Sequence, residues 1–337
     1  MLATLALFSL ACLSPQQPES AAGQQPLRVI TYNVHAWGPV AATDAGRQRA
    51  RQMTSRGQLL PRLALELQLH DPDVIALQEA HSEAKVAALA ALLEMDYAYF
   101  PGGWKGKGWQ EGISGAILSR SKIVAREDRP SIDAKIAKDK LFSRCLGRVV
   151  IAHGNEQIAI YCAHMLPSWK ETTHIREAEI RALTVASNKD LAAGRSVIVM
   201  GDMNHDSAAP EYRLWAEAGL VDTASQLNRD KALFTCPSQN PKERIDYVFV
   251  AGPIKTRLQS ARALHEGAFL VRPTVASSYA LSDHVPVLAV FGRCDGMALP
   301  LCLRDGLALA AVGLFCGCAP ASCAAGHQAL PVVAAER

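Results

Sequence analysis

Polar side chains of a few chemical kinds stand at the borders of apolar, strand-like runs throughout this chain. In "SDHVPVLAVF", Asp283 and His284 directly precede an alternating apolar run. Taken alone, this pair is equally compatible with a polar turn that carries a solvated histidine. Other strand-like runs repeat the arrangement, with these polar residues at or near their borders: Asn33, Glu79, His164, Asp202, Asn204 and Asp246.

Each of these residues alone has an ordinary structural explanation, such as a turn or the start of a loop. If the strand ends cluster, however, carboxylate oxygens, amide groups and two imidazoles converge. Oxygen-rich sites suit hard cations, Mg²⁺ first, with Mn²⁺ or Ca²⁺ as alternatives, rather than zinc. A hard cation beside a His–Asp pair fits the hydrolysis of phosphate esters, because the cation neutralises phosphate charge while an imidazole or carboxylate deprotonates water.

The elements that must position these residues alternate between strands and helices from residue 27 onward. Strand-like runs lie at 27–34, 73–80, 112–120, 145–153, 157–165, 195–207, 243–250 and 285–291. Helical spacing of apolar residues predicts helices at 57–70, 82–95 and 170–193 and a short one at 209–220. The runs 145–153 and 157–165 suit a hairpin about Gly154-Asn155. This order predicts an α/β layered fold, and alternation alone suggests a parallel sheet.

Composition sets broad limits on the protein. The chain has 337 residues, 49% of them hydrophobic and 20% charged, which is enough for one large domain or two. A formal net charge of +3 is too small to argue for nucleic acid or an anionic membrane as partner. The nine cysteines form no paired set with zinc spacing, and Cys145, Cys162 and Cys236 fit small buried side chains.

Both ends of the chain differ in composition from its middle, and we expect three parts. Residues 1–26 read as a signal peptide or lipoprotein-type leader with a linker, because the apolar run 2–13 resembles a secretory signal. Residues 27–293 form the catalytic domain, and 294–337 an apolar, Cys- and Ala-rich tail of unknown role. We therefore expect an exported protein, secreted or periplasmic, or lipid-anchored at the cell surface if Cys12 is lipidated and tethers the chain to the membrane.

A series of short motifs resembles those of one known superfamily. The motifs are "ITYNVHAWG", "DVIALQE", "GISGAILSR", "YCAHM", "VIVMGDMNHD", "RIDYVFV" and "LSDHVPVLAVF". In this order they resemble the successive motifs of the endonuclease/exonuclease/phosphatase superfamily, the deoxyribonuclease I-like group. The resemblance runs from Leu27 to about Arg293. It implies a four-layered α/β (α+β) sandwich, with two mostly antiparallel sheets packed face to face and helices outside, in place of a parallel sheet.

The resemblance also implies a metal site and a water-activating group. Glu79 would be the principal metal ligand, with Asn33 beside it and Asp283 contributing directly or through water. Asp202 would orient or deprotonate the attacking water. Asn204 would bind the scissile phosphate.

The two imidazoles receive separate roles from the resemblance. His284 would act as general base or would stabilise the charge of the phosphorane-like transition state. Asp246 would hold its tautomer and orientation. His164 would donate to the phosphate from the opposite side, with Glu111 as its candidate partner. Of the remaining polar residues, we expect His205 and Asp206 in a loop and His174 on a solvated helix surface. For His35 and His81 we expect surface positions, with the mouth of the site as the alternative.

The motifs leave the substrate open, since nucleases, lipid phosphodiesterases and phosphatases share them. A phosphodiester in nucleic acid is our first expectation, and a phospholipid, cut by a sphingomyelinase-like lipid phosphodiesterase, the second. A phosphatase and a catalytically inactive, surface-tethered binding module are further alternatives. The loop 102–112, with two Trp and two Lys, suits either base stacking or a membrane interface.

Two further features bear on partners. Four arginines lie close together in the sequence: Arg47, Arg49, Arg51 and Arg56. A solvated basic face is the ordinary interpretation of such a cluster, and a phosphate-facing patch the alternative. Nothing in the sequence implies an obligate protein partner.

Overall fold

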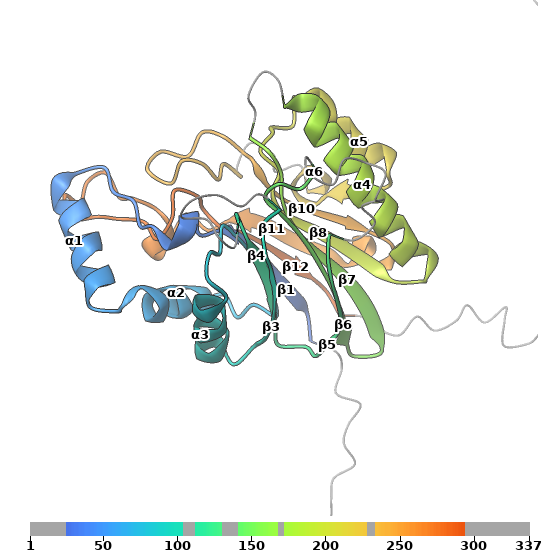
Figure 1. Cartoon of the computed structure of the whole chain (residues 1–337), viewed down its shortest axis with the longest axis horizontal. Coiled ribbons are helices and arrows are strands. Elements are labelled where there is room, and N and C mark those ends of the chain that lie inside the picture. The colour runs from blue at the N-terminus through green and yellow to red at the C-terminus, as the bar shows by residue number, and fades with distance from the viewer. Residues whose placement is uncertain (1–24, 104–111, 130–140, 168–171, 228–232, 294–337) are drawn as a thin grey trace, which may run out of the picture. The chain divides into compact units, whose positions relative to one another are not determined.

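The computed structural model describes residues 25–103, 112–129, 141–167, 172–227 and 233–293, all of which belong to one compact unit (Figure 1). Two six-stranded sheets pack face to face, and helices cover their outer faces (Figure 1). The expected four-layered sandwich is confirmed, and the parallel sheet suggested by alternation alone is wrong. Within the described residues, no helix has the length and apolar character needed to cross a membrane.

The first sheet carries the first three motifs, on β1, β2 and β4, and the last one, on β12. Its strand order is β11-β12-β1-β2-β4-β3. The strands are β1 (Leu27–Asn33), β2 (Val74–Gln78), β3 (Asp96–Phe100), β4 (Gly115–Ser119), β11 (Leu258–Ala263) and β12 (Val287–Phe291). Its helices are α1 (Asp44–Ser55), α2 (Leu59–Gln68) and α3 (Glu83–Leu93). Strands β1 and β2 are parallel, and the sheet's other recorded pairs are antiparallel.

The second sheet repeats this plan, with the order β5-β6-β7-β8-β10-β9. Its strands are β5 (Ile123–Asp128), β6 (Cys145–His153), β7 (Glu156–His164), β8 (Ser196–Asp202), β9 (Val221–Asp222) and β10 (Asp246–Ala251). Its helices are α4 (Thr173–Ala192), α5 (Arg213–Glu217) and α6 (Thr223–Gln226). Strands β7 and β8 are parallel, and the other recorded pairs are antiparallel.

The register of the central strands brings the polar strand ends to one end of the sandwich. Asn33 pairs with Gln78 at the carboxyl ends of the parallel strands β1 and β2. In the other sheet, Asp202 pairs with both His164 and Asp246. Parallel neighbours finish at the same sheet edge, and an antiparallel neighbour begins there. The motifs therefore meet because of strand direction and register.

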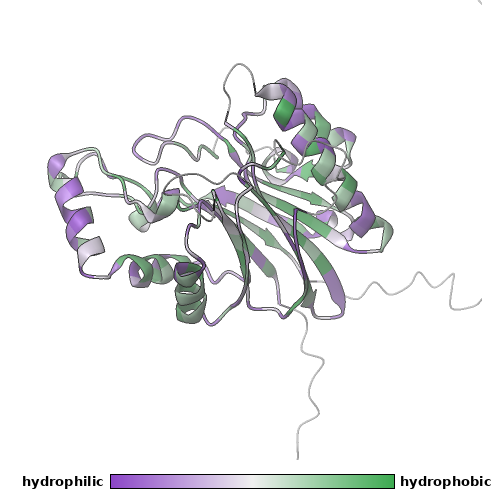
Figure 2. Cartoon of the chain, viewed as in Figure 1, coloured by the Kyte–Doolittle hydropathy of each residue, from purple (hydrophilic) through white to green (hydrophobic). Residues whose placement is uncertain are grey.

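The central strands are buried on both faces, and three apolar layers result. The layer between the sheets includes Val29, Val74, Ile160, Met200 and Val250. Separate clusters pack the first sheet against α1–α3 and the second against α4–α5. Hydrophobic residues accordingly dominate the central strands in Figure 2. A strand covered on both faces has a continuous apolar run, which in sequence looks the same as a strand of a parallel sheet.

Most expected elements are confirmed, including the hairpin of β6 and β7 about Gly154-Asn155. Three helices also lie where the apolar spacing predicts them, as α2, α3 and α4, and the short one appears as Pro210–Tyr212 and α5. The apolar pattern does not predict α1, α6, β3, β5, β9 or β11. Strand β5 is mostly exposed at the edge of its sheet, and α1 buries only Gly46, Ala50 and Met53, so neither has a strong apolar pattern.

Candidate active site at the strand ends

The carboxylate of Asp202, at the end of β8, lies at the centre of the candidate site. Its Oδ2 accepts a hydrogen bond from Asn33 Nδ2 of the other sheet at 3.0 Å. The same oxygen lies 3.3 Å from His164 Nε2 and 3.7 Å from His284 Nε2. Asp202 Oδ1 accepts the backbone N–H of Asn204 at 3.0 Å. The fold thus brings four of the other eight predicted site residues around the buried carboxylate of Asp202.

A second carboxylate orients one of the two imidazoles. Asp246 Oδ2 lies 2.9 Å from His284 Nδ1, and both side chains are buried. The hydroxyl of Ser282 accepts the backbone N–H of His284 at 3.1 Å and donates to the backbone oxygen of Asn33 at 2.6 Å. Ser282 therefore fixes the segment with Asp283 and His284 to the end of β1. The expected His284–Asp246 pair is present.

Glu79 directly follows β2 and contacts an arginine that the sequence analysis missed. Its Oε1 lies 3.4 Å from Arg144 Nη1 and 4.0 Å from His164 Nε2, and Arg144 Nη1 also contacts His164 Nε2. A signal for Arg144 was available. The hairpin about Gly154-Asn155 places Cys145 opposite His164. Arg144 directly precedes Cys145 and therefore lies beside His164.

The other predicted residues lie at the border of the site. Asp283 is one-third exposed, with its Oδ2 3.7 Å from His35 Nε2, so His35 belongs to the site mouth. The side chain of Asn204 donates from Nδ2 to the backbone oxygen of Met165 at 2.9 Å. Glu111, which the resemblance pairs with His164, lies outside the described residues.

Three further histidines have surroundings that differ from one another. His174 is exposed on α4, as expected. His205 follows the "GDMN" stretch as expected but is buried, and its Nε2 accepts the indole N–H of Trp215 at 3.1 Å. His81 is half-buried, with Nδ1 2.9 Å from the backbone oxygen of Gly112.

The surroundings of the two imidazoles shift their pKa values in opposite directions. Burial lowers the pKa of His284, but the carboxylates of Asp246 and Asp202 outweigh burial and raise it to about 10. Burial holds the pKa of His164 well below its usual range, and the Arg144 guanidinium lowers it further. Burial also raises the pKa of Asp202 to about 7, against the attraction of His284. A charged and a neutral imidazole thus flank a carboxylate whose pKa lies near neutrality.

Two separate sets of residues offer ligand atoms that suit a hard divalent cation. Ligand atoms of Asp202, Asp246 and His284 lie within 4.8 Å of one another. Asp246 Oδ1 is buried without a hydrogen-bond partner among the described residues, as expected of an oxygen that awaits a ligand. The set implied by the resemblance, centred on Glu79, offers only oxygen donors. Because hard cations prefer oxygen to imidazole nitrogen, the Glu79 set is the better chemical match.

Comparison with known proteins agrees with this fold. The model of the endonuclease/exonuclease/phosphatase family matches residues 56–284. That match covers more than half of the chain, which therefore belongs to this family of metal-dependent, nuclease- and phosphodiesterase-type hydrolases. A search of curated proteins found no match.

Solved structures share the fold at low sequence identity. Truncated TDP2 from Caenorhabditis elegans is 17% identical, with a TM-score of 0.54, covering 79% of this chain and 98% of its own. The human Nocturnin catalytic domain with bound sulfate is 19% identical, with a TM-score of 0.56 and coverage of 80% and 94%. A family member from Bacteroides thetaiotaomicron is 20% identical, with a TM-score of 0.56 and coverage of 80% and 96%.

A buried glutamate of α4 holds two segments of the site in place. Glu179 Oε1 accepts the backbone N–H of Phe142 at 2.8 Å, and its Oε2 accepts that of Leu166 at 3.3 Å. Each of these backbone groups lies two residues from a side chain of the site, Arg144 or His164. Burial raises the pKa of Glu179 to about 7 despite these bonds.

We therefore predict that Glu179 makes stability depend on pH. The pKa of Glu179 rises on folding from 4.5 to about 7. Between these two values the folded state binds a proton that the unfolded state has lost. The free energy of unfolding therefore falls as the pH rises through this range. Relative to Glu179→Gln, the free energy of unfolding of the wild type should fall by about 3 kcal/mol across this window. Urea unfolding of both proteins at pH 5 and pH 8 measures the difference.

The matched control is Glu177→Gln, a half-buried glutamate on the same helix. The pH dependence of the Glu179→Gln difference should clearly exceed that of this control. A difference for Glu179→Gln that varies with pH no more than the control's would show that Glu179 is already ionised in the folded protein at pH 5.

Proposed function

We propose that this protein hydrolyses phosphodiester bonds by attack of an activated water, with nucleic acid as the substrate class. The observation that carries the proposal is the Asp202 carboxylate, which joins the two sheets and lies between His164 and the oriented His284. A buried carboxylate between two imidazoles, one of them oriented by a second carboxylate, is typical of an active site. A binding module without catalytic activity, in contrast, would have no need of the His284–Asp246 pair.

Glu79 is the proposed principal holder of the cation, with Asn33 and Asp283 beside it. Mg²⁺ suits these oxygen donors best, although Mn²⁺ and Ca²⁺ would also fit them. When bound, the cation would neutralise charge on the phosphate and favour attack at phosphorus. Arg144, in contact with both Glu79 and His164, adds a second positive charge on the same side.

Asp202 is the proposed base. Its pKa near 7 places a carboxylate within reach of a water proton at neutral pH, where a general base works best. Asn204 and His164 flank this carboxylate and would contact the phosphate oxygens from two sides.

His284 is the proposed stabiliser of the negative charge on the phosphoryl oxygens in the phosphorane-like transition state. Carboxylates lie at both ring nitrogens, with Asp246 at Nδ1 and Asp202 near Nε2. This arrangement favours an imidazolium that donates a hydrogen bond rather than one that removes a proton. Of the two roles implied by the resemblance, the geometry therefore supports stabilisation of charge over general base.

Nucleic acid is the proposed substrate for two reasons. The fold is shared with Danio rerio TDP2 complexed with a single-strand DNA product, at 20% identity and a TM-score of 0.53. The arginine cleft described below also suits a polyanion. A phospholipid remains the alternative that the following experiment must distinguish.

The test of the proposed function is a substrate panel. The purified full chain should hydrolyse single-stranded DNA and bis-p-nitrophenyl phosphate with Mg²⁺ and lose this activity in EDTA, because the carboxylates alone cannot neutralise the phosphate charge. Product formation is followed by gel electrophoresis and by release of nitrophenolate. Absence of turnover on every substrate would overturn the proposal. Turnover of sphingomyelin, but not of DNA, would transfer it to the lipid phosphodiesterase class.

Two substitutions should separate binding of the cation from chemistry. Glu79→Gln should weaken Mn²⁺ binding, measured by calorimetry, by roughly tenfold or more. His284→Ala should keep Mn²⁺ affinity near the wild-type value but lower kcat by roughly 10²–10⁴-fold. His174→Ala, on the exposed face of α4, is the control and should alter neither quantity.

The reverse pattern would contradict the assignment. Intact Mn²⁺ binding in Glu79→Gln together with its loss in His284→Ala would place the cation on the group of Asp202, Asp246 and His284. Activity of His284→Ala at the wild-type level would remove His284 from the reaction.

We also propose that the protein is exported, on the basis of the apolar run 2–13 and the Pro- and Gln-rich segment after it. Residues 1–24, including Cys12, lie outside the described part of the chain. Expression of the full chain in a bacterial host followed by N-terminal sequencing should reveal a mature protein that begins after residue 13. A lipid-modified N-terminus at Cys12 would indicate anchoring, and a cell-associated protein that retains Met1 would contradict export.

A further inference from the structure

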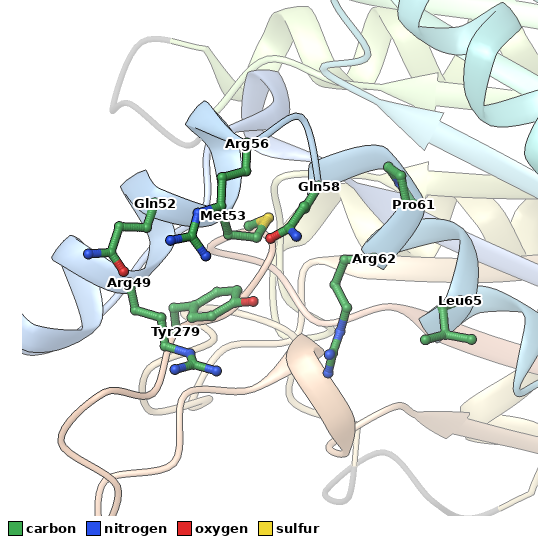
Figure 3. Close-up of a pocket in the computed structure, with 9 residues that line it drawn as sticks. All are labelled: Arg49, Gln52, Met53, Arg56, Gln58, Pro61, Arg62, Leu65 and Tyr279. Atoms are coloured by element: carbon green, nitrogen blue, oxygen red, sulfur yellow. The ribbon is translucent and has the colours of Figure 1, made fainter.

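A cleft lined by arginines lies between α1, α2 and the loop before the "SDH" segment. Two adjoining cavities of about 420 and 380 Å³ share Arg49, Arg62 and Tyr279. Arg56 lines the first cavity, and Arg272 the second. We call these five residues the arginine cleft. Figure 3 shows the part around the ring of Tyr279, with arginines from both helices around it.

The arrangement differs from a solvated basic face. Arg49 lies on α1, and Arg56 directly follows the last residue of that helix; both side chains lie on the side of Tyr279 (Figure 3). Arg62 pairs with the buried Glu66 at 2.5 Å. In the part of the chain that the structure describes, no acidic side chain forms an ion pair with the other three arginines of the cleft. Three guanidinium groups are thus available to an external anion.

The chain path ties the arginine cleft to the candidate active site. Tyr279 precedes Asp283 by four residues, so their Cα atoms are at most about 14 Å apart. Between them, Ala280 pairs with Val40, and Ser282 bonds to the end of β1. A polymer bound at the active site would therefore place its next few phosphates at the cleft.

We propose that the arginine cleft binds the phosphates of single-stranded nucleic acid beyond the scissile bond, with Tyr279 as a stacking surface for a base. Arginine recognises phosphate oxygens with paired N–H donors, and an aromatic ring stacks with any base. The proposal rests on the function proposed above, since it assigns the substrate class for that site. It also replaces the solvated face, the ordinary interpretation of this arginine cluster, with the phosphate-facing one.

A membrane is the competing occupant. Leu65 is exposed at the border of the cleft, and Leu69, one turn further, and Leu92 are exposed as well. These leucines would suit a lipid surface. However, the aromatic ring of Tyr279 is partly buried within the cleft, where a flexible strand can enter and a flat bilayer cannot.

The test compares two triple variants of the full chain. The cleft variant carries Arg49→Gln, Arg56→Gln and Arg272→Gln. The control carries Arg51→Gln, Arg126→Gln and Arg181→Gln, three exposed arginines that do not line the cleft, so the change in net charge is the same. Binding of a fluorescein-labelled 20-nucleotide oligodeoxythymidine is measured by anisotropy in EDTA, and hydrolysis is measured with Mg²⁺.

The cleft variant should bind the oligonucleotide at least tenfold more weakly than the control. The slope of log K against log salt should become shallower by about 2, since each phosphate contact to a single strand contributes about 0.7. With Mg²⁺, the ratio of kcat/KM for the oligonucleotide to that for bis-p-nitrophenyl phosphate should fall at least tenfold in the cleft variant alone. Tyr279→Leu should weaken oligonucleotide binding without altering the salt slope.

Equal binding by the two triple variants would overturn the proposal. So would selective loss of binding to phosphatidylglycerol vesicles, measured by flotation, with oligonucleotide binding intact, because the occupant would then be a membrane. The anisotropy arm does not depend on turnover. Failure of the proposed catalytic function, seen as inactivity of the wild type on every phosphodiester, is thereby distinguishable from failure of the cleft.

Discussion

The buried carboxylate of Asp202 is the constraint on which the rest of the site depends. An ionisable group between two sheets is costly unless its oxygens are paired. Here one oxygen is paired by Asn33 from the first sheet and approached by two imidazoles, and the other accepts the backbone of Asn204. These partners come from both sheets, so the Asp202 carboxylate is paired only when the two sheets are correctly aligned.

The direction of the central strands brings these partners together. Each sheet has a parallel pair at its centre, β1 with β2 and β7 with β8, and antiparallel strands around it. The polar ends of the central strands therefore lie at one end of the sandwich, while apolar runs fill the space between the sheets. Loops around this end are free to vary without disturbing the core. This separation explains why the reaction can be inferred from the strand ends, whereas the substrate must be inferred from surrounding features such as the arginine cleft.

The sequence predicted the residues of the site better than the partners that hold them. Asp246 and His284 could be paired because each borders an apolar run and the resemblance assigns them a joint role. The antiparallel sheets came from the resemblance alone, because strands buried on both faces lack the alternation of half-buried ones. Glu179 could not be found, since a glutamate within a helix is ordinarily solvated and only packing against Phe142 and Leu166 buries it. Arg144 needed the hairpin register, because it precedes its strand and belongs to no motif.

The arginine cleft shows why net charge is a weak guide to partners. The formal charge of +3 sums acids and bases over the whole chain, and on its own it is too small to argue for nucleic acid as a partner. An anion bound at one place responds only to charges within about a Debye length, roughly 8–10 Å at physiological salt. Within that range, paired charges such as Arg62 with Glu66 largely cancel, and unpaired ones such as Arg49 and Arg56 remain. Recognition of a polyanion thus depends on which arginines lack a carboxylate neighbour and whether they face one cavity.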